Sequence, residues 1–143
     1  VNNGAQSTTG NVYGVYDMSG GAYEYVAAYV NTGNSNLTTY GSSLVNGEAK
    51  MKNVYAKGST DSYEDNYQQN KEIYGNAVYE TSTSSSGTTS WHGGYSAFPY
   101  ENNTFFKWGG YYGNSYGAGV FCFGGSTGNA GKVASFRPVL VAN

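Results

Sequence analysis

Residues 105–123 read FFKWGGYYGNSYGAGVFCF, and residues 124–141 continue as GGSTGNAGKVASFRPVLV. Short aromatic segments separated by glycine pairs predict strands joined by tight turns, because glycine accepts backbone conformations that other residues avoid. Phe121 and Phe123 flank Cys122, and successive side chains of a strand point to opposite faces. We therefore expect the two rings to face the core and the Cys122 thiol to lie on the opposite, exposed surface.

Two further strands are predicted outside this stretch. Residues 22–28 mix aromatic and β-branched residues in near alternation behind a glycine-rich turn at 17–21. The apolar run 136–141 is predicted to form a strand that is at an edge or bulged at Pro138, since proline has no backbone donor. Residues 50–57 are consistent with either a short strand or a turn.

Helices are expected to be few and short, about a fifth of the chain. Asp61 and Ser62 can cap a helix whose first turn is acidic, and a second short helix is predicted around 73–78. Residues 31–47 and 81–90 are dominated by small polar residues, and we predict that both are surface loops.

Composition excludes several classes of function. The chain has 143 residues, of which only 11% are charged, and its formal net charge is −2. A nucleic-acid-binding face needs clustered Lys and Arg, so we expect no nucleic-acid partner. No apolar run approaches the roughly 20 residues of a membrane helix, so we expect no membrane insertion.

Catalytic chemistry is restricted by the presence of one Cys and one His. An internal disulfide, a cysteine-based zinc site and a site with two or three His ligands all need more of these residues. A nucleophile pair of Cys122 and His92, or a glycosidase pair among the nine carboxylates, stays open as an alternative. The residues around them are typical of ordinary structure, so we predict no enzyme activity, no metal site and no cofactor.

Three segments carry a resemblance to the formylglycine-generating enzyme (sulfatase-modifying factor) family. They are NVYGVYDMSGGAYEYV at 11–26, FFKWGG at 105–110 and SFRPVL at 135–140. The first is similar to the family signature GLYDMxGNVWEW, with Tyr23 and Tyr25 in place of tryptophans. The resemblance implies a C-type-lectin-like α+β fold, rich in loops and low in helix, whose N-terminal part is missing from this chain.

The family's redox chemistry is not implied. Formylglycine-generating enzymes use a pair of cysteines and copper, and relatives that oxidise thiol–histidine compounds hold iron on three histidines. Cys122 is the single cysteine and His92 the single histidine of this chain. The resemblance therefore implies the fold without the activity.

Residues 105–140 resemble more closely the C-terminal variable region of target proteins of diversity-generating retroelements, above all those of Gram-positive gut bacteria and their phages. In these proteins a frame of aromatic, glycine and alanine positions stays constant. The positions between them vary because their Asn codons are mutated at adenines. The residues between the frame positions here are mostly of the types that such mutation yields, although Lys132 and Trp108 do not follow from a simple Asn codon.

The resemblance implies one domain over residues 1–143, with a variable region at about 91–140 that forms a ligand-binding face. The face would consist of Tyr111, Gly113, Asn114, Tyr116, Gly117, Cys122, Gly124, Gly125, Ser126, Thr127, Asn129, Gly131, Lys132, Val133 and Ala134. It would extend to His92, Gly93, Gly94, Ala97 and Trp108. We expect these residues to be solvent-accessible and grouped on one surface.

The expected function is non-catalytic binding of a protein or carbohydrate ligand, for receptor binding or adhesion. The domain would be displayed on a bacterial surface appendage or a phage tail, and so be extracellular, at a cell surface or on a virion. The missing N-terminal segment or another chain would cover the edge of the strand at 136–141. The alternatives are a structural pilin-like subunit and a degenerate oxidoreductase of the formylglycine-generating type.

The predicted core consists of aromatic and aliphatic residues from the expected strands. They are Tyr23, Tyr25, Phe105, Phe106, Phe121, Phe123, Phe136 and Leu140.

Overall fold

The computed structural model describes residues 21–71 and 76–136, with every side chain in that part except Tyr116. The strands there are β1 (Tyr23–Val30), β2 (Asn53–Tyr55), β3 (Ser86–Ser90), β4 (Gly94–Ala97), β5 (Phe105–Trp108), β6 (Phe123–Ser126) and β7 (Ala134–Ser135). The helices are α1 (Asn36–Asn46), α2 (Tyr63–Gln69) and α3 (Ala77–Thr81), with short 3-10 helices η2 (Ala49–Met51), η3 (Trp91–Gly93) and η4 (Ser115–Gly117). The expected α+β class and the low helix content are confirmed.

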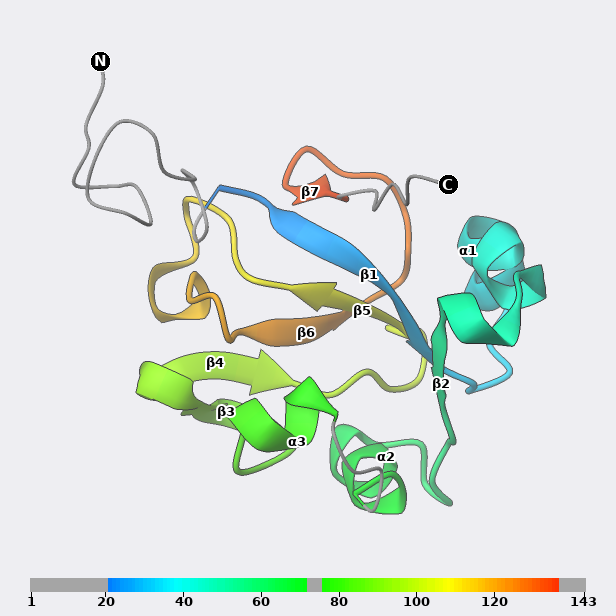
Figure 1. The fold of residues 1–143 in the computed structure, drawn as a ribbon, viewed down its shortest axis with the longest axis horizontal. Helices are drawn as coiled ribbons and strands as arrows, with labels where there is room; N and C mark the ends of the chain where they lie inside the picture. The colour runs from blue at the N-terminus through cyan, green and yellow to red at the C-terminus, as the bar shows by residue number, and fades with distance from the viewer. Residues whose placement is uncertain (1–20, 72–75, 137–143) are drawn as a thin grey trace.

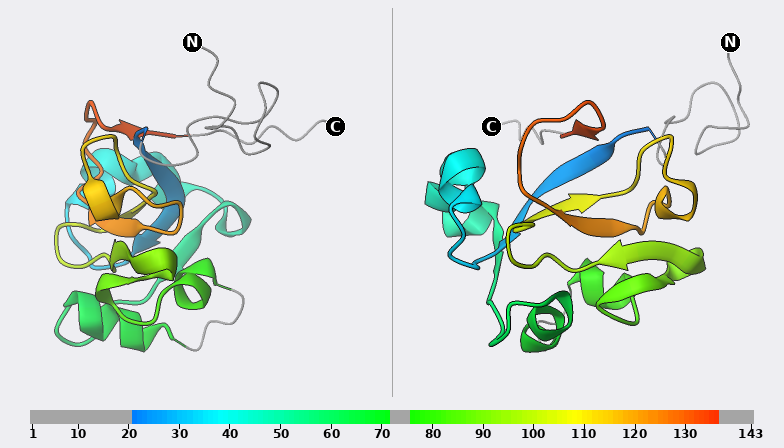
Figure 2. Two further views of the ribbon diagram at one scale, coloured as in Figure 1. Left: turned by 90° about the vertical axis from the view of Figure 1, so that its left-hand side faces the viewer. Right: turned by 180° about the vertical axis from the view of Figure 1, so that it is seen from behind.

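The described strands form one mixed sheet in the order β2-β1-β5-β6-β4-β3, and β7 also pairs with β1 (Figure 1). β5 is antiparallel to both β1 and β6, whereas β4 and β6 are parallel. The short strands β2 and β7 pair with opposite ends of β1. Helix α1 lies beside the end of the sheet at β1 and β2, and α2 and α3 lie on the side of the molecule away from β7 (Figures 1 and 2).

One face of the sheet carries the main core. Phe106 and Phe123 pack there with Val30, and Phe98 lies between Phe106 and the rings that α2 and α3 contribute. Phe98 and Val30 are both fully buried. A second, smaller cluster lies on the other face, where Tyr29, Leu37 and Phe105 pack beneath α1. Among the described residues, no helix packs on the rest of that second face.

The confirmed predictions of secondary structure rest on signals from residues close together in the sequence. The strand at 22–28 is β1, and residues 53–55 form the short strand β2. Helix α2 begins as its capping residues predict, because the Ser62 side chain accepts a hydrogen bond from the Asp65 N–H at 3.1 Å. Of the second predicted helix, residues 72–75 lie outside the described residues, and residues 77–78 belong to α3.

Two loop predictions were wrong. Residues 36–46 form α1, because Leu37, Leu44 and Val45 lie on one side of the helix and pack against Tyr29 and Phe105. Residues 86–90 form β3, whose backbone pairs antiparallel with β4. Ser and Thr side chains are tolerated in both elements because tertiary contacts outweigh their low intrinsic propensity.

The predicted core was correct in part. Phe105, Phe106 and Phe123 are buried, at 4%, 1% and 2% exposure. Tyr23, Tyr25 and Phe121 are only partly buried, and Phe136 is exposed at 74%, so its assignment to the core was wrong. Leu140, most of the strand at 136–141 and most of the turn at 17–21 lie outside the described residues.

The expected orientation of Cys122 was also wrong, because β6 begins only at Phe123. Cys122 lies in the turn before the strand, where its N–H donates to the Gly119 carbonyl at 2.9 Å. Strand alternation does not apply there, and the thiol is buried at 2% exposure. Phe121 instead packs against the rings of Trp91 and His92, with ring centroids 5.2 and 5.9 Å away.

Candidate binding face

The uncovered part of the second sheet face is formed by Tyr23 and Tyr25 of β1, Lys107 of β5, and Gly124 and Ser126 of β6. We call these five residues the open face. Register brings them together, since Tyr25 pairs with Lys107 and Lys107 pairs with Gly124 across three adjacent strands. Alternation along each strand then places the five on the same side of the sheet. Phe106 and Phe123 point to the other side, into the core.

The β5–β6 loop (109–122) is attached to this face through Tyr23. The Asn114 side-chain amide donates a hydrogen bond to the Tyr23 hydroxyl, and the Tyr111 ring lies 5.6 Å from the Tyr23 ring. Asn114 also donates to the Gly117 carbonyl at 3.2 Å, which closes the loop on itself. The loop is therefore positioned over one end of the open face.

The β6–β7 loop (127–133) is attached to the same face through Tyr25. The Tyr25 hydroxyl is hydrogen-bonded to the Ser126 hydroxyl at 2.7 Å and donates to the Asn129 carbonyl at 3.1 Å. At the end of this loop, the Val133 carbonyl accepts from the Tyr23 N–H at 2.8 Å. The two loops leave opposite ends of β6 (Figures 1 and 2) and are both held by tyrosines of β1.

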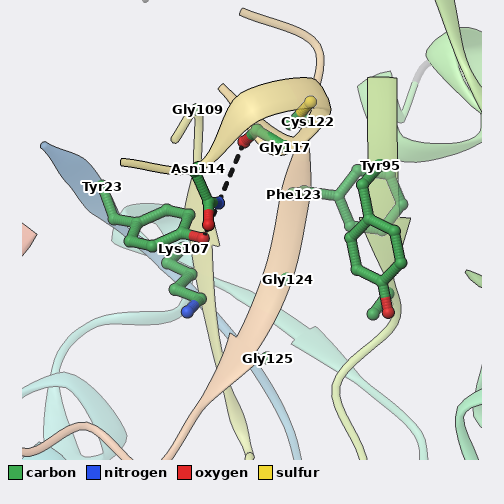
Figure 3. A pocket seen from close by; sticks show the side chains of 11 residues that line it. Tyr23, Tyr95, Lys107, Gly109, Asn114, Gly117, Cys122, Phe123, Gly124 and Gly125 are labelled. Carbon is green, nitrogen blue, oxygen red and sulfur yellow. Dashed lines mark hydrogen bonds between the residues drawn. The ribbon is translucent and has the colours of Figure 1, made fainter. Parts of the chain in front are cut away.

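A hollow of about 130 Å³ lies where the open face meets the β5–β6 loop. Figure 3 shows Tyr23 and Lys107 on one side of β6 and Tyr95, from β4, on the other. Gly124 lies between them and leaves room for the lysine, because a Cβ at position 124 would be 3.3 Å from Lys107 Cε. Two aromatic side chains thus flank a strand with little side-chain bulk.

Lys107 is the charged group of this hollow. Its Nζ lies 3.9 Å from the centre of the Tyr23 ring, a cation–π contact, and burial lowers the pKa of its ammonium group. In the described part of the chain, no carboxylate lies within 4.0 Å of that Nζ. Burial also raises the pKa of the Tyr23 hydroxyl, although the hydrogen bond from Asn114 acts in the opposite direction. Tyr23 therefore stays protonated near neutral pH.

The structure brings several of the sequence-predicted residues together at the hollow. Asn114, Gly117, Cys122, Gly124 and Gly125 line it, as does Ala97 from the predicted extension. Elsewhere, Ser126 belongs to the open face and Thr127, Asn129, Gly131, Lys132 and Val133 to the β6–β7 loop, whereas Ala134 begins β7. Tyr111 and the exposed Gly113 belong to the β5–β6 loop, and His92 and Gly93 are exposed in η3. The side chain of Tyr116 lies outside the described part.

The expectation that all of these residues are accessible was wrong at four positions, and the expectation that they share one surface was wrong for Trp108. Cys122 is buried for the reason given above. Gly94, Gly117 and Gly124 are buried because neighbouring atoms pack closely against their backbone. Trp108 lies on the other face of the sheet, because it follows Lys107 directly along β5. Its ring stacks there on the Phe123 ring, with the ring centroids 5.3 Å apart.

Sequence reasoning did not identify Tyr23, Tyr95 or Lys107 as residues of the site. A usable signal existed for Lys107, since a strand over residues 105–108 places it on the side opposite Phe106. Tyr95 had no comparable signal, because its position depends on the parallel pairing of β4 with β6, which joins Ser96 to Phe123.

Within residues 21–71 and 76–136, no three or more His, Cys, Asp or Glu side chains are grouped so that they could hold a metal ion. No helix in those ranges is long and apolar enough to span a bilayer. Comparison of the chain with the models of known protein families, with curated proteins and with solved structures found no match.

Proposed function

We propose that this chain is a non-catalytic ligand-binding domain, and that its ligand binds at the open face and the two loops attached to it. One observation carries the proposal. The two loops of the segment expected to vary are both held on the same sheet face by Tyr23 and Tyr25. Of the aromatic residues of the expected constant frame, Phe123 lies on the opposite face, in the core, and Phe105 is buried beneath α1. Residues at the surface could thus change without replacing the residues that hold the fold.

The chemistry of the face supports a role in recognition. Tyrosine offers a large, rigid contact area at a low cost in side-chain entropy, and Gly, Ser and Asn adapt the shape and the hydrogen bonds around it. Tyr112, in the β5–β6 loop, is exposed at 84%, and its ring packs edge-on against the Tyr111 ring. Such exposed aromatic side chains are typical anchors of binding interfaces.

The finer assignment follows from the resemblance described above. We propose a C-type-lectin-like fold of the kind found in the variable proteins of diversity-generating retroelements. The ligand would be a protein or a carbohydrate, met outside the cell by a domain displayed on a bacterial surface appendage or a phage tail. The mixed sheet with its loop-rich C-terminal half is compatible with this assignment.

Two display libraries of the full chain test the proposal. The first randomises exposed or half-exposed positions of the two loops: Tyr111, Thr127, Asn129, Gly131 and Lys132. The control library randomises five exposed positions around α1 and η2: Ser42, Asn46, Glu48, Ala49 and Lys50. Both are selected against one panel of immobilised oligosaccharides and folded proteins.

We expect most members of both libraries to fold, since exposed substitutions usually change stability by no more than about 0.5 kcal/mol. Binders should come from the loop library and rarely from the control library, because only the former varies the loops attached to the tyrosines of the open face. Equal yields from the two libraries would contradict the proposal. A loop library that folds but gives no binder would instead favour a structural subunit.

A further inference from the structure

Lys107 is a charged residue that lies partly buried on the open face. Its ammonium group contacts the ring of Tyr23 rather than a carboxylate of the described residues. Removing a charge from water costs free energy unless an opposite charge or hydrogen bonds replace the water. An ammonium group held in this way attracts an anion, and the partly buried surroundings strengthen that attraction compared with an exposed lysine.

The hollow limits the size and the shape of that anion. At about 130 Å³ it has room for several water molecules, which matches a carboxylate and the ring atoms next to it. Tyr23 and Tyr95 flank it with aromatic surface, on which the C–H groups of a saturated ring can pack. The half-exposed Asn114 lines the same hollow; its side-chain nitrogen donates to Tyr23 and Gly117, which leaves its carbonyl oxygen to accept from a sugar hydroxyl.

We propose that this hollow binds the carboxylate of an acidic sugar, with Lys107 as the residue that recognises its charge. This inference rests on the proposed function and names the class of ligand. A flexible acidic peptide would offer the same carboxylate without a ring to pack between the tyrosines, so we favour the sugar.

Position 124 then determines specificity. Any side chain there places a Cβ 3.3 Å from Lys107 Cε, tighter than an ordinary contact, so the lysine must move. Gly124 is one of the positions that the sequence resemblance implies to be variable. Substitution at this one position would therefore shift or cover the amine and change the ligand without affecting Phe106 and Phe123.

The test measures binding of the full chain to albumin conjugates of glucuronate, galacturonate and N-acetylneuraminate. The comparison probes are the same sugars as methyl esters and an albumin conjugate of a glutamate-rich peptide. Four proteins are compared: the parent, Lys107→Met, Gly124→Ala and the control Lys57→Met, which removes an exposed lysine between β2 and α2. Circular dichroism and thermal melting establish that each variant is folded.

The parent should bind at least one acidic sugar about ten- to a hundredfold more tightly than its ester, the range expected for one charge-assisted hydrogen bond. Lys107→Met should lose that preference, Gly124→Ala should weaken it, and Lys57→Met should keep it. If Lys107→Met does not fold, nitrogen NMR of the lysine side chains in the parent gives the answer. The Lys107 signal should then shift with the acid and not with its ester.

Several results would overturn the inference: no binding of any acidic sugar, equal binding of acid and ester, a preference for the peptide, or full binding by Lys107→Met. A loop library that still gives binders would leave the proposed function standing in those cases. If the loop library gives no more binders than its control, the proposed function itself fails.

Discussion

Alanine at position 94 should destabilise the protein through a single atom. Gly94 begins β4 with φ −72° and ψ 153°, an extended conformation open to any residue, so the backbone adds no strain. A Cβ there would lie 2.6 Å from the Sγ of Cys122, about 1 Å inside the usual contact distance. Its next neighbours, at 3.6 and 3.7 Å, are at ordinary distances. Because Cys122 is buried, its thiol has little space to move into, and we expect a cost of about 1–3 kcal/mol.

The same geometry predicts a rescue. Cys122→Ala removes the colliding sulfur at the cost of a small buried group, about 1 kcal/mol. The double variant should therefore be more stable than the sum of the single variants, with a coupling of about 1 kcal/mol or more. Gly131→Ala is the matched control, since nothing lies within 4 Å of its added Cβ.

Denaturant unfolding of the parent and the four variants, followed by two spectroscopic probes, measures these free energies. For a chain of this size, 1 kcal/mol corresponds to a change of about 4 °C in Tm. Gly94→Ala as stable as the parent, or a double variant that is simply additive, would refute the buried position of the thiol. It would restore the sequence expectation of an exposed Cys122.

Two further predictions concern the hydrophobic core and the loss of stability at acid pH. Phe106→Ala should lower the unfolding free energy by about 3–5 kcal/mol because the ring is 1% exposed. Phe136→Ala should change it by less than about 0.5 kcal/mol because that ring is 74% exposed. Equal effects of the two variants in denaturant titrations would contradict the assignment of Phe106 to the core. Hydrogen bonds, first of all from the Thr60 N–H, hold the pKa of the Asp65 carboxyl in the folded protein below its ordinary 3.8. As the pH falls, the unfolded chain is therefore protonated at this carboxyl before the folded protein is. The contribution of the carboxylate to the unfolding free energy is complete above pH 3.8 and is lost as the pH falls through the folded pKa. Urea unfolding at pH 7, 4 and 3 should show a smaller acid loss for Asp65→Asn than for the parent, and an identical loss would be evidence against these hydrogen bonds.

The elements that the sequence could predict are those whose signals are local. Helix α2 follows from a capping serine and an acidic first turn, both within four residues of its start. Helix α1 reads NLTTYGSSLVN and lacks such a signal. Its stability comes from Leu37 and Leu44, which pack against Tyr29 of the preceding strand and against Phe105, a residue far away in the sequence. A single sequence does not show that contact.

The site was misjudged where a strand boundary was misjudged. A strand begun at Phe121 instead of Phe123 assigns Cys122 to a sheet face, although it lies in a buried turn. Alternation was reliable where the strand was real, and over residues 105–108 it separates Lys107 from Phe106 and Trp108. The face residues of β5 were therefore predictable, whereas those that depend on loop geometry were not.

The frame itself limits which positions of the proposed face can vary. A Cβ at Gly131 would meet open space, and one at Gly113 would approach only the Tyr111 ring, a side chain at the edge of the loop, at 2.9 Å. At Gly125 it would lie 2.8 Å from the backbone carbonyl oxygen of Asn103, which cannot move without disturbing β5. Mutation that is blind to structure would change all three positions alike, but folding would remove most changes at 125 and keep those at 131. Diversity in ligand recognition would then arise mainly from the two loops, while Gly125, within β6, keeps the floor of the hollow constant.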